Sequence, residues 1–282
     1  MINMIGSDYS TNIKSRPYFK GSCVPNVFSK YTKKYLASRS RDATTRLVKV
    51  VPDVVSKVHE VNIPISKDYH IYAWDINPKN SKNYVLFLHG LAMNISHYQD
   101  FYKALMNKVG IFAVEYTGYG KNASKQASEK ILYRDVRKAY EYLIKSKNIE
   151  PEKIIVVGSC LGGALAVDLA KSEKNIKSMI LIAPFVSLNA LSKKYITNKK
   201  IFNSKIFNKL IMNNKLIKWI FSRQFNVFNK MKSIRNTETY LIQSRQDPVT
   251  RIGGAKILAN IASKNSVLKE FYLLESGGHK VD

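Results

Sequence analysis

Short apolar runs rich in β-forming residues recur along the chain, and stretches with helical spacing separate most of them from the second run onward. The runs are HIYAWDI, YVLFLHG, IFAVEYT, KIIVVGS, MILIAP, TYLIQS and EFYLL. The helical stretches are expected at residues 95–107, 128–147, 161–171 and 254–262. Strands that are apolar throughout and alternate with helices indicate a parallel sheet with helices on both faces. The pattern therefore predicts an α/β fold with a mostly parallel central sheet.

Two basic segments do not follow this alternation. Residues 1–58 show little periodicity and are interpreted as a basic N-terminal extension, which leaves residues 59–282 as the main domain. Within that domain, residues of about 190–236 contain no Asp or Glu, and their apolar residues recur at helical intervals. We expect a basic, amphipathic helical cap insertion there. Two interpretations stay open: the cap packs its apolar face on the core, or it faces a membrane and gates an acyl chain.

The charge balance is strongly basic, with 46 Lys and Arg against 20 Asp and Glu and a formal net charge of +26. Such an excess favours a negatively charged partner, and peripheral contact with an anionic membrane is one expectation. The alternative is an ordinary lysine-rich surface without a partner. No module that reads nucleic acid is recognisable, so specific nucleic-acid binding is not expected.

Compartment and ligands can be predicted from what the sequence contains. The first residues lack the apolar core of a signal peptide, and the longest apolar run, MILIAPFV, is too short to span a bilayer. Cys23 and Cys160 are far apart and form no CxxC pair, which argues against a disulfide framework or a zinc site. We therefore predict a cytoplasmic protein without a transmembrane segment, a metal or a cofactor, and a peripheral membrane location stays open.

The segment GSCLGG, residues 158–163, follows the run KIIVV and precedes a helical stretch. It matches the nucleophile motif G-x-S-x-G with Cys160 in the reacting position. Glycines two residues before and after Cys160 are expected where the sharp turn brings backbone too close for a side chain. The amino terminus of the following helix favours a thiolate at this place. Ser159 occupies the variable position and is interpreted as a bystander.

Three other loops after predicted strands carry the groups that such a nucleophile needs. The loop HGLAMN follows YVLFL, so the amide of Leu91, together with that of Leu161, is predicted to form an oxyanion hole. His89 in the same loop is interpreted as structural. Asp247 follows TYLIQ, and His279 follows EFYLL through a Gly-Gly turn. The chain order nucleophile, acid, histidine is that of α/β-hydrolase triads.

From about residue 58 to the end, these motifs together resemble a known superfamily. They are LFLHGLAMNISH, VEYTGYG, VVGSCLGG, IAPFVSL, SRQDPV and GGH. The chain resembles the α/β-hydrolase superfamily, and within it the small intracellular hydrolases that include relatives of yeast bud-emergence protein 46 and mammalian α/β-hydrolase domain-containing proteins that remove palmitate. Family members usually carry serine where this chain has Cys160, although dienelactone hydrolases also use cysteine on this elbow.

The resemblance implies an α/β-hydrolase fold and acyl transfer. The predicted function is hydrolysis of carboxylic ester or thioester bonds by a triad of Cys160, His279 and Asp247 through a covalent acyl-enzyme. The expected substrate is a small molecule or a lipid acyl group. Three alternatives stay open: an inactive hydrolase-fold protein that binds membranes or a partner, an acyltransferase, and a peptidase acting on small peptides.

Overall fold

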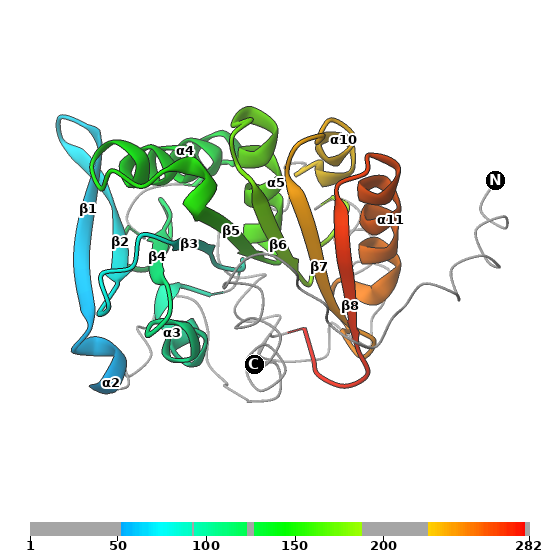
Figure 1. The fold of residues 1–282 in the computed structure, drawn as a ribbon, viewed down its shortest axis with the longest axis horizontal. Helices are drawn as coiled ribbons and strands as arrows, with labels where there is room; N and C mark the ends of the chain where they lie inside the picture. Colours follow the sequence, from blue (N-terminus) through cyan, green and yellow to red (C-terminus); the bar gives the residue numbers. More distant parts are fainter. Residues whose placement is uncertain (1–51, 92, 123–126, 188–224, 280–282) are drawn as a thin grey trace, which may run out of the picture.

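The structure is a computed structural model that describes residues 52–91, 93–122, 127–187 and 225–279 (Figure 1). Its centre is an eight-stranded sheet with the strand order β1-β2-β4-β3-β5-β6-β7-β8. The strands are β1 (Val58–Ser66), β2 (Tyr69–Ile76), β3 (Tyr84–Leu88), β4 (Gly110–Glu115), β5 (Ile154–Ser159), β6 (Ser178–Ile182), β7 (Glu238–Ser244) and β8 (Leu268–Leu274). The sequence prediction of an α/β fold is confirmed.

Strand directions divide the sheet into two parts. β1 and β2 pair antiparallel, and β2 also pairs antiparallel with β4. All other neighbouring strands, which lie in the order β4-β3-β5-β6-β7-β8, run parallel. The carboxyl ends of the parallel strands therefore meet at one edge, where loops from several strands can form a joint site.

Helices cover both faces of the sheet, as predicted. They are α2 (Pro52–Val55), α3 (Gln99–Leu105), α4 (Glu129–Lys145), α5 (Leu161–Ser172), α10 (Val227–Met231) and α11 (Arg251–Lys264), with 3-10 turns η1 (Ile95–Tyr98), η2 (Gly120–Asn122) and η3 (Pro151–Lys153). α4, α5, α10 and α11 contribute to one apolar cluster, whereas α3 contributes to a second cluster on the opposite face (Figure 1). Among the described helices, none is long and apolar enough to cross a membrane.

The edge strand β1 was not predicted from the sequence. Buried and exposed residues alternate only around Val61 and Ile63, which are buried. Pro64 lies beside an irregularity in the pairing with β2. Proline lacks the amide that a ladder needs and is confined to edges and bulges. A short alternation interrupted by proline is a weak strand signal, which explains the omission.

The structure gives other boundaries for the two basic segments, the N-terminal extension and the cap insertion. α2 precedes β1 and packs on α3, with Val54 fully buried, so the folded part begins before residue 59. Residues 190–224 of the expected cap lie outside the described residues. The remaining residues, 225–236, include α10, whose Val227 and Met231 are buried in the same cluster as α5 and α11. This part of the expected cap therefore belongs to the core.

Candidate active site

Cys160 stands at the sharp turn between β5 and α5. Its backbone angles are φ 51° and ψ −105°, a left-handed conformation that side-chain-bearing residues rarely adopt. The Cys160 amide donates to the carbonyl of Ile182 at 2.8 Å, and its carbonyl accepts from the amide of Gly163 at 3.0 Å. Strained backbone of this kind persists only where the surroundings fix it, and it gathers at functional sites.

The glycines on either side of Cys160 have the steric reason that the sequence predicted. A Cβ atom on Gly158 would lie 2.3 Å from the carbonyl oxygen of Gly162. A Cβ atom on Gly162 would lie 2.0 Å from the carbonyl oxygen of Leu88, the last residue of β3. The absence of these two side chains allows the elbow to pack directly against the end of β3.

Asp247 and His279, which follow β7 and β8, meet at the same edge of the sheet. His279 Nδ1 lies 3.0 Å from Asp247 Oδ2 and 3.1 Å from Oδ1. Asp247 is buried and also accepts hydrogen bonds from Thr250 Oγ1 at 2.6 Å and from the amide of Val249 at 2.7 Å. Gln243 Nε2 donates to Asp247 Oδ2 at 3.0 Å. Burial acts to raise the pKa of Asp247, but the hydrogen bond and charge of His279 outweigh it and hold this pKa well below its usual range.

The imidazole of His279 connects Asp247 to Cys160. Its Nδ1 faces the carboxylate, and the ring lies near enough to Cys160 for a thiolate charge there to act on it. Burial acts to lower the pKa of His279, but the charge of a Cys160 thiolate and the hydrogen bond to Asp247 raise it to about 10. The structure thus brings together three side chains that lie on loops after β5, β7 and β8.

Contacts from the end of β7 hold the loop that carries His279. The hydroxyl of Ser244 donates a short hydrogen bond to the carbonyl of Gly277. The amide of Arg245 donates to the carbonyl of Leu274 at 2.8 Å, and its guanidinium pairs with Glu275. These contacts were not predicted from the sequence, because a serine and an arginine at a strand end have no signature of their own.

The two amides predicted for an oxyanion hole lie on either side of the elbow. Leu161 is the first residue of α5, so its amide has no acceptor within the helix. Leu91 follows Gly90, where a Cβ atom would lie 3.6 Å from the Cβ of Cys160. Within the described part of the chain, the Leu91 amide makes no backbone hydrogen bond. The two amides therefore remain the candidates for binding a ligand oxygen near Cys160.

His89 stabilises the loop that carries Leu91 through contacts with its backbone. It is fully buried, its Nδ1 lies 2.9 Å from the carbonyl oxygen of Gly90, and its Nε2 lies 3.1 Å from Glu115 Oε1. The hydroxyl of Tyr98 accepts a hydrogen bond from the Gly90 amide at 3.1 Å. These contacts agree with the structural interpretation of His89. They add Glu115 as its buried partner, which the sequence did not identify.

Ser159, which precedes Cys160, is the last residue of β5 and is buried, with 5% of its surface exposed. Within the described ranges, no group of three or more His, Cys, Asp or Glu residues is arranged to hold a metal ion.

The fold and this edge of the sheet define an α/β-hydrolase. A family model described as serine aminopeptidase, S33, matches residues 79–233 of the 282-residue chain. The match covers more than half of the chain, which therefore belongs to this hydrolase family.

Relatives and solved structures agree with this assignment. The chain is 36% identical over 110 residues to α/β hydrolase domain-containing protein 17B of Xenopus tropicalis, and the aligned region covers 38% of each chain. It is also 36% identical over 110 residues to human protein 17C of the same series, covering 38% of this chain and 33% of that protein. The matches thus span only 33–38% of the length of these relatives.

The structural likeness covers more of the chain. An esterase of Pyrococcus furiosus superposes with a TM-score of 0.67 at 17% identity, covering 86% of this chain and 91% of that one. A puromycin-hydrolyzing peptidase of Mycobacterium tuberculosis superposes with a TM-score of 0.61 at 15% identity, covering 82% and 38%. At this level of identity the likeness supports the fold, which is that of the α/β-hydrolases.

Proposed function

We propose that the protein hydrolyses carboxylic ester or thioester bonds through a triad of Cys160, His279 and Asp247. The observation that carries the proposal is the hydrogen-bonded pair of Asp247 and His279 beside Cys160, which stands on a strained elbow. A nucleophile, a base within hydrogen-bond reach and a third group that orients the base are the parts that acyl transfer requires.

The reaction would proceed in two halves. His279 takes the proton of the Cys160 thiol, and the thiolate attacks the carbonyl carbon of the substrate. The oxyanion that forms is stabilised by the amides of Leu91 and Leu161. The carbon–oxygen or carbon–sulfur bond to the leaving group breaks, and the leaving group takes the proton from His279. Water that His279 deprotonates then attacks the acyl thioester, which releases the acid and restores the thiol.

The electrostatics of His279 support this scheme. A pKa of about 10 means that the ring holds a proton readily when Cys160 is a thiolate. The buried carboxylate of Asp247 fixes the Nδ1 proton and stabilises the positive ring. The pair is thus suited to supply a nucleophile and a proton donor in the same step.

A lipid acyl group is the substrate class that we favour. The formal net charge of +26 would attract the protein to an anionic membrane surface, where acyl esters and thioesters are found. In this proposal the protein is cytoplasmic and binds the membrane peripherally. The basic N-terminal extension before α2 and the part of the cap insertion before α10 contribute to that contact.

The test uses p-nitrophenyl esters of increasing acyl length and an acyl thioester. We expect turnover that iodoacetamide and Cys160→Ala abolish, whereas Ser159→Ala, the neighbouring control, stays within about twofold of the parent. Turnover that survives Cys160→Ala, or that Ser159→Ala abolishes, would refute the assignment of the nucleophile. Acyl product that appears mainly on an added alcohol or amine would identify an acyltransferase instead.

Peptidase activity is the second candidate, since the matching family is described as serine aminopeptidase. The same covalent steps would cleave an amide bond. Aminoacyl p-nitroanilides measured beside the esters decide between the two candidates. Faster turnover of the anilides at equal concentration would favour the peptidase. Wild-type protein that turns over none of these substrates and yet binds anionic vesicles would instead favour a binding protein.

A further inference from the structure

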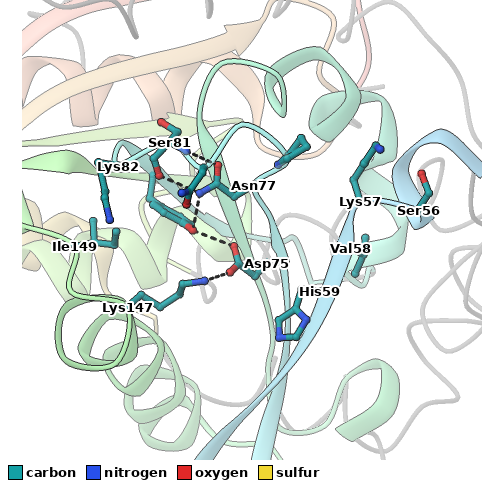
Figure 2. A pocket seen from close by; sticks show the side chains of 13 residues that line it. Ser56, Lys57, Val58, His59, Asp75, Asn77, Ser81, Lys82, Lys147 and Ile149 are labelled. Carbon is teal, nitrogen blue, oxygen red and sulfur yellow. Dashed lines mark hydrogen bonds and ion pairs between the residues drawn. The ribbon is translucent and has the colours of Figure 1, made fainter.

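A cavity lies at the edge of the sheet opposite to Cys160. It has a volume of about 620 Å³ and is lined by the end of β2, the start of β3, the segment before β1 and the segment after α4 (Figure 2). Tyr84, the first residue of β3, faces this cavity, whereas Leu88 at the other end of β3 contacts the elbow. Four residues of strand separate the two by about 13 Å. The cavity is therefore distinct from the candidate active site.

An ion pair between a buried carboxylate and a partly exposed lysine forms one wall of the cavity. Asp75 is 4% exposed and accepts a short hydrogen bond from the ammonium of Lys147. The hydroxyl of Tyr84 donates to Asp75 Oδ1 at 3.2 Å, and Asn77 Nδ2 donates to that hydroxyl at 3.0 Å. Burial acts to lower the pKa of Lys147, but Asp75 raises it above its ordinary value, so Lys147 stays charged. The carboxylate in this wall is thus already neutralised.

Two more lysines line the cavity without a carboxylate to neutralise them. Figure 2 shows Lys82 and Lys57 on opposite sides of Asn77. Among the residues that the structure describes, neither ammonium lies within ion-pair distance of an Asp or Glu. Three ammonium groups and one carboxylate leave the lining with a net positive charge. Such a hollow concentrates anions from solution.

We propose that this cavity binds a phosphate monoester, either a free small molecule or the headgroup of a phosphorylated lipid. A phosphate monoester carries close to two negative charges and three acceptor oxygens near neutral pH, which match the two unneutralised ammonium groups of Lys57 and Lys82. The volume falls within the range of small-molecule sites. Asn77 and Ser81 hydrogen-bond to each other and to Tyr84 and Asn83, which fixes the wall between the two lysines.

The test compares two doubly substituted full-length chains that carry the same charge. Lys57→Gln with Lys82→Gln removes the two unneutralised charges of the cavity. Lys67→Gln with Lys264→Gln removes two exposed lysines that do not line it. Binding of inositol 1,4,5-trisphosphate is measured by calorimetry at 150 mM salt. We expect the cavity variant to lower the affinity by about tenfold or more and the control to change it by less than twofold.

Vesicles of phosphatidylcholine with and without phosphatidylinositol 4-phosphate identify the source of the phosphate. Lysine-dependent binding to the phosphorylated vesicles supports a lipid headgroup, and lysine-dependent binding of the free probe alone supports a free ligand. Equal losses in both double variants would reveal only general attraction to a basic surface and overturn the proposal. No binding of either probe to the wild type would overturn it as well, as would loss of binding on alkylation of Cys160. Because none of the four substituted lysines forms an ion pair with a residue that the structure describes, both variants should unfold at the parent's urea midpoint.

Discussion

Replacing Gly162 by alanine should uncouple the elbow from the end of β3. The added Cβ would lie 2.0 Å from the Leu88 carbonyl oxygen and 2.5 Å from its carbon, both of them backbone atoms. Because real Cβ contacts essentially never fall below 3.0 Å, the two segments must separate by about 1 Å. Overpacking of this kind costs about 1–3 kcal/mol of unfolding free energy. For a domain of this size the melting temperature should fall by about 2–4 °C for each kcal/mol.

The same displacement should weaken the proposed oxyanion hole. Its donors must lie about 2.7–3.1 Å from the oxyanion, and loss of one donor lowers kcat by about 10²–10³. Leu91 is three residues beyond Leu88, so a shift of about 1 Å there moves one of the two donors out of range.

The neighbouring glycine provides the control for this prediction. A Cβ atom on Gly163 would meet nothing closer than 3.5 Å, and alanine is favoured over glycine within a helix by about 0.5–1 kcal/mol. Gly163→Ala should therefore keep or slightly raise the melting temperature and leave ester turnover within about twofold. Thermal unfolding and p-nitrophenyl ester turnover of both variants decide the matter. A Gly162→Ala variant as stable and as active as Gly163→Ala would refute the packing argument.

Three further predictions concern the triad and its loop. Asp247→Asn removes the acceptor that fixes the His279 tautomer, and kcat for ester turnover should fall by about 10³–10⁴; a loss below tenfold would contradict this role. The pKa of His279 rises from 6.5 to about 10 on folding, so its stabilising contribution is full below about pH 6.5 and is lost as the pH rises to about 10. Urea unfolding across that range should show a decline that His279→Gln reduces. Ser244→Ala removes the hydrogen bond to the Gly277 carbonyl, and kcat should fall by about tenfold with KM unchanged; a change confined to KM would point to substrate contact instead.

The parallel part of the sheet could be predicted from the sequence because its strands are buried on both faces. A run such as YVLFL in β3, whose residues are all buried, has no other stable place than the centre of a covered sheet. β1 has one exposed face and a proline, so its sequence looks like that of a loop. The sequence signal of a strand is thus stronger where more of the strand is buried, and the prediction was weakest at the antiparallel edge of the sheet.

The positions of the candidate site residues could be predicted because each follows a strand of known direction. The carboxyl ends of β5, β7 and β8 lie on one edge, so Cys160, Asp247 and His279 had to come near one another once the strands were assigned. The supporting contacts could not be predicted in this way. Glu115 lies at the end of β4 and pairs with His89 only because β3 and β4 are neighbours, which follows from strand order and not from any local pattern.

The backbone contacts at Cys160 allow either cysteine or serine at this position of the elbow. The strained φ of 51° is held by contacts from three elements: the carbonyl of Ile182 at the end of β6, the amide of Gly163 in α5, and the packing of Gly162 on β3. None of these contacts involves the side chain of residue 160. The backbone of the elbow is therefore set by the sheet and the glycines. In the function proposed above, a thiol in place of a hydroxyl changes the chemistry of the nucleophile and leaves the backbone that positions it intact.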